Sequence, residues 1–257
     1  MVDRASFNSD RLPVEYFDSR FSDDNLRYWV PVLVDAAQIT ARTRVLDVGC
    51  GTGGFSRGIA DRSSAHVIGC DASERFIQYA RGQPEPSRGA VRWVVGDAEE
   101  LPFHAGSFDR VLLSLVLHQL ADPDAAVREA FRVLSEGGLA VVRTIAPEDV
   151  HHRVPERYVP AMAKADAARL IPVETLREIL AKAGFGLVST ERILRNKLLS
   201  LEQEERALIA ERARYDFLTD DEVTDGLRRM REDAAAREGD WIDPRPTVIL
   251  VAAKPTM

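Results

Sequence analysis

The sequence predicts an α/β fold of the doubly wound type, in which helices cover both faces of a mostly parallel sheet. Two observations support this prediction. Short apolar runs of strand length alternate along the chain with segments whose apolar residues recur at helical spacing. Residues 44–54 then join an apolar run, a cluster of glycines and the start of a helix, which is the pattern of a nucleotide-binding unit.

The composition is that of one globular domain. The 257 residues can bury a sizeable core, and no apolar run approaches the ~20 residues that a membrane-spanning helix needs. A net charge of −7 disfavours a general nucleic-acid partner, because the phosphate backbone attracts basic surfaces. The first ten residues contain no apolar core of a signal peptide, so we expect a cytoplasmic protein without a membrane partner.

The first 40 residues precede the first predicted strand and are expected to form a cap. Tyr16 and Phe17 lie in an aromatic stretch without a regular period, and we expect them to close over a ligand. The stretch Ser-Asp-Asp-Asn at residues 22–25 is predicted to cap a helix that carries Trp29 on its apolar side.

The glycine loop after the first strand fits two kinds of ligand. Gly49, Gly51 and Gly54 satisfy the G-x-G-x-x-G spacing of dinucleotide-binding turns. A second interpretation uses Gly49, Gly51 and Gly53, which follow the buried acid Asp47. In both cases the free N–H groups of the turn and of the next helix face the ligand.

The second and third strands also end in acids. Residues 65–71 form a strand that ends in Asp71, whose carboxylate can accept both hydroxyls of a ribose or cap the next helix. Residues 91–95 form a third strand, which runs into a turn that contains Asp97. Ligands of open parallel sheets lie at the carboxyl ends of the strands, so these acids mark a candidate site.

Predicted strands and helices continue to alternate to the end of the chain. A fourth strand begins at residue 111, and Asp122 opens a helix that precedes a fifth strand at residues 139–142. The later predicted elements are a helix at 173–183, a strand at 186–194, two charge-rich helices within 200–239 and a strand at 247–253. The mixed charges of the two helices indicate a solvated face.

Four motifs in this order resemble those of class I S-adenosylmethionine-dependent methyltransferases of the small-molecule type. They are Leu-Asp-Val-Gly-Cys-Gly-Thr-Gly, the acid and Leu-Pro-Phe after the third strand, Leu-His-Gln-Leu with Asp-Pro after the fourth, and Leu-Ser-Glu-Gly-Gly before the fifth. Gln119 and Glu136 depart from the family's usual histidine and proline. The resemblance implies a seven-stranded sheet with one antiparallel strand, the last, and helical or irregular cap segments.

The resemblance also divides the chain. It implies an N-terminal cap at 1–40, a cofactor-binding half at 41–145 and a substrate-side insertion at 146–172. A C-terminal half at 173–257 would contain the helical segment 200–239.

S-adenosylmethionine is the cofactor that the resemblance implies. Asp71 is expected on its ribose and Asp97 on its adenine. The full set of expected cofactor-binding residues is Asp47, Gly49, Cys50, Gly51, Gly53, Asp71, Ala72, Phe76, Asp97, Ala98, Ser114 and Leu115. No metal is expected, and Cys50 and Cys70 are expected to be free thiols.

Methyl transfer from a sulfonium requires alignment and a dry cavity, and it requires a base only if the nucleophile arrives protonated. His118, His151 and His152 are candidate bases, and Asp149 and Tyr158 are further ones. His118 has the alternative role of packing at the strand end. His151 and His152 are adjacent, so both cannot face one pocket in an extended chain.

The acceptor is expected to be a small molecule methylated at oxygen, nitrogen or carbon. We expect residues 10–21 and the irregular segment 145–172 to close its pocket, with Tyr16, Phe17 and Tyr158 as lining residues. A cofactor-binding protein with other chemistry, a catalytically silent subunit and a dehydrogenase are the alternatives. The sequence carries no signal for an oligomeric state.

Overall fold

The computed structural model describes residues 22–212, 215, 217–238 and 241–256. Tyr16 and Phe17 lie outside the described residues, so their expected role as a lid stays a prediction. The strands are β1 (Arg44–Val48), β2 (His66–Asp71), β3 (Ala90–Val95), β4 (Phe108–Ser114), β5 (Leu134–Thr144), β6 (Gly186–Leu198) and β7 (Ile242–Ala253).

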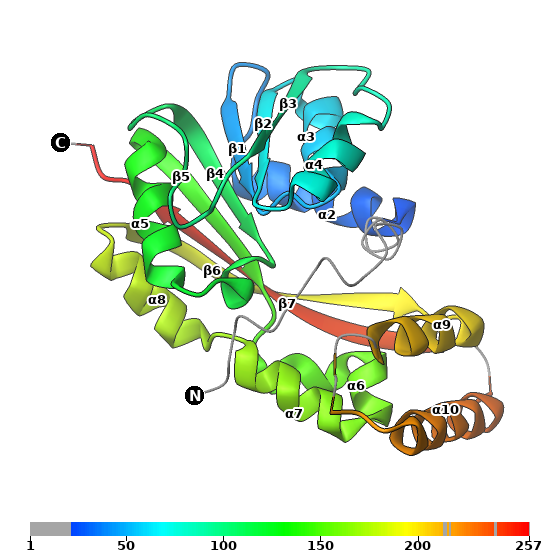
Figure 1. The fold of residues 1–257 in the computed structure, drawn as a ribbon. Helices are drawn as coiled ribbons and strands as arrows, with labels where there is room; N and C mark the ends of the chain where they lie inside the picture. The colour runs from blue at the N-terminus through cyan, green and yellow to red at the C-terminus, as the bar shows by residue number, and fades with distance from the viewer. Residues whose placement is uncertain (1–21, 213–214, 216, 239–240, 257) are drawn as a thin grey trace.

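Within the described residues, these strands form one seven-stranded sheet in the order β3-β2-β1-β4-β5-β7-β6 (Figure 1). The pairs from β3 to β5 are parallel, and β7 runs antiparallel to both β5 and β6. A separate bridge joins Asp97 and Glu100 outside the strands. The predicted α/β class, with a mostly parallel sheet and an antiparallel last strand, is confirmed.

The helices are α2 (Asp23–Ala36), α3 (Gly54–Ser63), α4 (Glu74–Arg81), α5 (Pro123–Val133), α6 (Val154–Tyr158), α7 (Pro160–Arg169), α8 (Val173–Lys182), α9 (Leu201–Arg212) and α10 (Asp220–Ala235). Two 3₁₀ turns, η3 (Leu117–Gln119) and η4 (Pro147–His152), follow β4 and β5. The oxygen of the Ser22 side chain accepts a hydrogen bond from the Asn25 N–H, so the predicted cap of α2 is confirmed.

Each face of the sheet has its own hydrophobic core. Trp29 of α2 and Ile59 of α3 pack with Val45 and Val141 on one face, which we call the α2/α3 face. On the other face α5 and α8 pack against alternate residues of the same strands, such as Leu46. Because side chains alternate along a strand, both neighbours of Asp47 point away from the α2/α3 face and Asp47 points toward it.

The segment between β5 and α8 departs from the expectation. We expected residues 145–172 to be irregular, but they form η4, α6 and α7. Pro147, Pro155 and Pro160 lie in the first turns of these three elements. Proline is compatible with the first turn because no hydrogen bond of the helix is lost there, so these prolines begin helices instead of breaking them.

The last two strands are longer than predicted and support a helical lobe. β6 continues to Leu198, β7 begins at Ile242, and the extra residues pair with each other. We define the helical lobe as these strand extensions together with α6, α7, α9 and α10, which gather around one end of β6 and β7 in Figure 1. Its buried core contains Tyr158, Met230 and Trp241.

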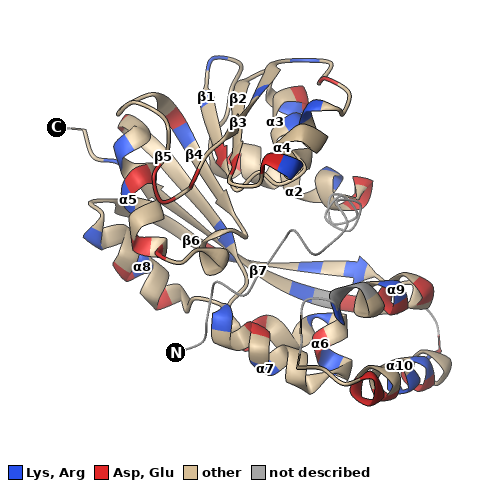
Figure 2. Ribbon diagram, viewed as in Figure 1, with Lys and Arg blue, Asp and Glu red and all other residues tan. Residues whose placement is uncertain are grey.

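Acidic and basic residues alternate along α9 and α10 (Figure 2). Arg228, for example, lies 2.7 Å from Glu232 and 2.6 Å from Asp225 on the same helix. Both helices therefore present the mixed, solvated face that the sequence predicts. Among the described helices, none is long and apolar enough to cross a membrane.

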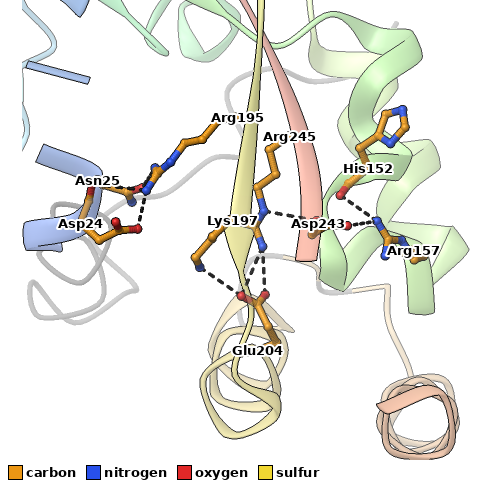
Figure 3. A network of polar contacts seen from close by, with 9 residues as sticks. All are labelled: Asp24, Asn25, His152, Arg157, Arg195, Lys197, Glu204, Asp243 and Arg245. Carbon is orange, nitrogen blue, oxygen red and sulfur yellow. Dashed lines mark hydrogen bonds and ion pairs between the residues drawn. The ribbon is translucent and has the colours of Figure 1, made fainter. Parts of the chain in front are cut away.

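A network of ion pairs joins the helices of the lobe to the strand extensions (Figure 3). Asp243 of β7 is 1% exposed and accepts hydrogen bonds from Arg157 of α6 and Arg245 of β7. Glu204 of α9 lies 3.1 Å from Lys197 and 3.2 Å from Arg245. Charges from two strands and two helices therefore neutralise one another where the lobe meets the sheet.

We predict that Asp243→Ala destabilises the protein by about 1–3 kcal/mol, because two guanidinium groups lose their buried acceptor. Urea unfolding followed by circular dichroism measures this change. Glu202→Ala is the control, since Glu202 forms an exposed pair with Arg206 within α9 and should contribute little. Equal effects of the two substitutions would contradict the role assigned to Asp243.

Candidate functional site

The candidate site lies along the carboxyl ends of the central parallel strands. Asp47 lies next to the end of β1, Asp71 ends β2 and Ser114 ends β4. The parallel register places these ends side by side, with Val48 opposite both Cys70 and Leu113. The topology therefore brings the predicted motifs to one edge of the sheet, where open α/β sheets bind ligands.

Two glycines of the loop leave no space for a side chain. Gly49 and Gly53 have φ values of 69° and 79°, which favour glycine. A Cβ atom on Gly49 would lie 2.4 Å from the Val116 side chain, and one on Gly53 would lie 2.2 Å from the Trp93 ring. Gly53 is also the N-cap of α3, and because glycine has no side chain it makes no side-chain cap hydrogen bond to this helix.

Asp71 fixes the glycine loop to the end of β2. Its Oδ2 accepts a hydrogen bond of 2.8 Å from the Gly51 N–H, and its Oδ1 accepts one of 2.9 Å from the Ser73 N–H. The residue that caps α4 is Ser73 and not Asp71. Burial raises the pKa of Asp71, and the two N–H groups oppose that shift. A carboxylate has about four acceptor positions, so capacity for two further hydroxyl donors remains.

The turn after β3 is held by α5. Arg132 donates hydrogen bonds to the carbonyl groups of Leu101 and Phe103, and Glu129 accepts one from the Leu101 N–H. Asp97, which is exposed, and Ala98, which is buried, begin this turn. Glu129 and Arg132 therefore position the predicted adenine-binding turn, a role that the sequence analysis missed because their partners lie about 30 residues away.

Asp47 is a buried acid beside the loop. It is 3% exposed, and Ser56 of α3 donates a hydrogen bond of 2.6 Å to its Oδ2. Burial raises the pKa of Asp47 to about 6, the Asp71 charge adds to the shift, and Ser56 and Arg143 oppose it. The nearby cation is Arg143, at the end of β5. In the sequence, Arg143 can be recognised as the single charged residue within the apolar run of that strand.

Several buried polar atoms near the loop are left without partners. Within the described parts of the chain, Thr52 Oγ1, Ser114 Oγ and the Nε and Nη1 atoms of Arg143 have no hydrogen-bond partner. They belong to the glycine loop and to the ends of β4 and β5. Because buried polar groups in native proteins are nearly always satisfied, this group of atoms indicates a ligand with polar groups of its own.

The three candidate histidines lie on the two 3₁₀ turns. His118 is half-buried in η3, which directly follows the end of β4. His151 and His152 lie in η4, where their ring centres are 4.1 Å apart, and His151 is exposed. Figure 3 shows the His152 ring directed away from Arg157, which contacts the His152 carbonyl group.

Asp149 and Tyr158 have structural partners. Asp149 is 2% exposed and forms an ion pair with Arg192. The Tyr158 hydroxyl donates a hydrogen bond to Asp233, and burial together with that acid raises the pKa of Tyr158 to about 12. The Tyr158 ring is 6% exposed and packs in the core of the helical lobe, and its expected role as a lining residue of the acceptor pocket stays a prediction.

The remaining expectations concern thiols and metals. Cys50 and Cys70 are free, buried thiols, and burial raises the pKa of both. No group of three potential metal ligands occurs among the residues that the structure describes.

Comparison with known proteins identifies relatives. A family model described as a methyltransferase domain matches residues 46–142. The chain is 33% identical over 171 residues to the biotin biosynthesis bifunctional protein BioHC of Cellvibrio japonicus; this alignment covers 65% of the chain and 33% of that protein. It is 30% identical over 184 residues to the ubiquinone/menaquinone biosynthesis C-methyltransferase UbiE of Cereibacter sphaeroides, covering 63% of the chain and 74% of that enzyme.

Among solved structures, the fold is similar to that of the [4+2]-cyclase SpnF. The TM-score is 0.61 at 24% identity, over 91% of this chain and 82% of that chain. At this level of identity the similarity concerns the fold alone.

The raised pKa of Asp47 predicts a pH-dependent cost of folding. In the unfolded chain Asp47 titrates near pH 4, whereas in the folded chain it titrates near pH 6. The folded state therefore binds the proton more tightly, and stability falls as the pH rises between these values. Asp47→Asn should become more stable than the wild type over this window, by on the order of 2–3 kcal/mol at pH 7. Urea unfolding of both proteins at a series of pH values measures the difference, and a pH-independent difference would contradict it.

Proposed function

The chain belongs to the class I S-adenosylmethionine-dependent methyltransferases, and we propose that it methylates an oxygen, nitrogen or carbon atom of a small-molecule acceptor. The methyl donor is S-adenosylmethionine. The observation that carries the proposal is the arrangement of the carboxyl edge, where the glycine loop, Asp71 and the turn at Asp97 follow three adjacent strands.

The residues at this edge fit the cofactor. The loop that contains Gly49, Gly51 and Gly53 is proposed to border the cofactor, and Gly49 and Gly53 let it pack tightly against Val116 and Trp93. The unpartnered hydroxyls of Thr52 and Ser114 can bond to a polar ligand. We assign the ribose to Asp71 and Ala72, the nucleoside face to Phe76, and the adenine to Asp97 and Ala98. Asp47, Cys50 and Leu115 complete the proposed contacts. The Cys50 N–H donates a hydrogen bond to the Cys70 carbonyl group of β2, and the Cys50 carbonyl group accepts one from the Gly53 N–H, so Cys50 helps to shape the loop.

Bound S-adenosylmethionine supplies a methyl group that is already activated on a sulfonium. The protein must then align the acceptor with that methyl group and exclude water; alignment can contribute on the order of 7–11 kcal/mol. η3 and η4 follow the ends of β4 and β5, so His118, His151 and His152 are our candidates for removing a proton from an acceptor that arrives protonated. His118 lies within one turn of the proposed cofactor contact Leu115 in the sequence, which makes it the first to test.

A small-molecule acceptor is supported by the relatives and by charge. UbiE is named as a C-methyltransferase of ubiquinone and menaquinone biosynthesis. The net charge of −7 disfavours a nucleic acid. Because the fold also occurs in a [4+2]-cyclase, chemistry other than methyl transfer is the alternative that needs a direct test.

The proposed reaction is tested with S-adenosylmethionine that carries an isotope-labelled methyl group. We predict that incubation with the protein and a cell extract transfers the label to a small molecule, detected by mass spectrometry. Label in protein or nucleic acid would contradict the acceptor class. Cofactor binding without any transfer would instead favour non-methylating chemistry or a catalytically silent subunit.

We predict that Asp71→Ala weakens binding of S-adenosylhomocysteine at least tenfold, because charge-assisted hydrogen bonds to the ribose are lost. Isothermal titration calorimetry measures the affinity. Asp109→Ala is the matched control: Asp109 binds Arg44 at 2.7 Å, at the amino ends of β4 and β1, so its loss should leave the affinity unchanged. An unchanged affinity in folded Asp71→Ala would refute the ribose contact.

A further inference from the structure

Arg143 is a buried cation at the carboxyl end of β5. Its side chain is 8% exposed, and its guanidinium carbon lies 4.6 Å from the Trp29 ring centre and 4.9 Å from that of Phe55. Burial lowers the pKa of Arg143 to about 9, so the group remains charged at neutral pH. The two aromatic rings stabilise the charge through cation–π contacts and hold the side chain in place.

Two nitrogen atoms of the Arg143 guanidinium group have hydrogen-bonding capacity that is not used. Its Nε and Nη1 atoms are buried and have no hydrogen-bond partner in the described part of the chain. Arg195, the other buried arginine of the α2/α3 face, is bonded to Asp24 and Asn25. Repulsion from the charge of Arg195 also lowers the pKa of Arg143, in addition to the effect of burial. A buried charge whose donors are left unsatisfied is costly, so this arrangement favours the binding of an anion.

Asp47 is the acid that faces the same region. Asp47 of β1, Ser114 of β4 and Arg143 of β5 point toward the α2/α3 face from three adjacent strands, and Ser114 and Arg143 are register partners. Asp47 and Arg143 influence each other's charge, yet the ion pairs found within the described residues do not include one between them. A buried acid and a buried base therefore lie on either side of Ser114 without neutralising each other by contact.

We propose that Arg143 binds the carboxylate at the amino-acid end of S-adenosylmethionine, while Asp47 faces the ammonium group. An amino-acid zwitterion carries both charges on one carbon atom, which matches a site with one buried acid and one buried base. A guanidinium binds a carboxylate through short charge-assisted hydrogen bonds. Phe55, which packs on Arg143, lies in the first turn of α3 directly after the glycine loop, so the anion site adjoins that loop. The inference rests on the proposed cofactor and assigns a residue to it.

Comparing two ligands distinguishes binding of the amino-acid end from binding of the rest of the cofactor. S-adenosylhomocysteine contains the amino-acid end, and 5′-methylthioadenosine has the same nucleoside without it. Calorimetry of the wild type and of Arg143→Met should show S-adenosylhomocysteine weakened about 10–100-fold by the substitution, with 5′-methylthioadenosine changed less than about threefold. Arg143→Lys, which keeps the charge but not the planar donors, should recover part of the loss.

The melting temperature of the ligand-free protein shows whether Arg143 has a role in binding or a role in stabilising the fold. Arg143→Met removes an unpartnered buried charge and keeps an apolar side chain between the rings, so its melting temperature should equal or exceed that of the wild type. Arg110→Met is the control. Arg110 donates hydrogen bonds to the carbonyl groups of Ala37 and Asp109, so this substitution should lower the melting temperature and leave the ratio of the two affinities unchanged.

Each outcome decides the assignment. The assignment is overturned if Arg143→Met lowers the affinity for both ligands equally, or lowers neither affinity. If neither affinity falls, an anionic acceptor is left as the partner of Arg143. Failure of the wild type to bind S-adenosylhomocysteine would contradict the proposed function as well. Normal binding by the wild type with an unaffected Arg143→Met variant contradicts only the inference about Arg143.

Discussion

The hydrogen bond from the Gly51 N–H to the Asp71 carboxylate is the contact on which the site depends. It joins the turn after β1 to the end of β2, and the N–H groups of Gly49 and Cys50 strengthen this junction by donating to the Cys70 carbonyl group. The position of the loop determines where α3 begins. α3 carries Ser56, which bonds to Asp47, and Phe55, which packs on Arg143. The position of the loop therefore also determines the surroundings of Asp47 and Arg143.

The sequence was sufficient for the features that short-range patterns encode. Strand positions follow from apolar runs bounded by turn residues, and the end of a strand predicts where its last acid lies, as for Asp71. Within the helical lobe, α9 and α10 were predicted as two charge-rich helices, whereas α6 and α7 were not, because the segment 145–172 was expected to be irregular. Pro147, Pro155 and Pro160 of that segment each lie in the first turn of a helical element. The extra length of β6 and β7 depends on their mutual pairing, which no local pattern shows.

The site was predicted in part for the same reason. The glycine loop and the strand-end acids are local motifs, and the topology places them together. Contacts between distant segments were missed: Glu129 and Arg132 hold the turn after β3 from α5, and Tyr158 is buried by the lobe. Arg143 was missed although it is a single charge within an apolar run, because its importance depends on two aromatic rings and the acid of another strand, which come from distant segments.

The measurement that tests this account most directly is a crystal structure of the protein with S-adenosylhomocysteine. The account predicts that the ribose hydroxyls contact Asp71, that the adenine lies in the turn of Asp97 and Ala98, and that the amino-acid end lies between Asp47 and Arg143. A ligand bound away from the carboxyl ends of β1, β2 and β4, or bound there in the reverse orientation, would contradict it.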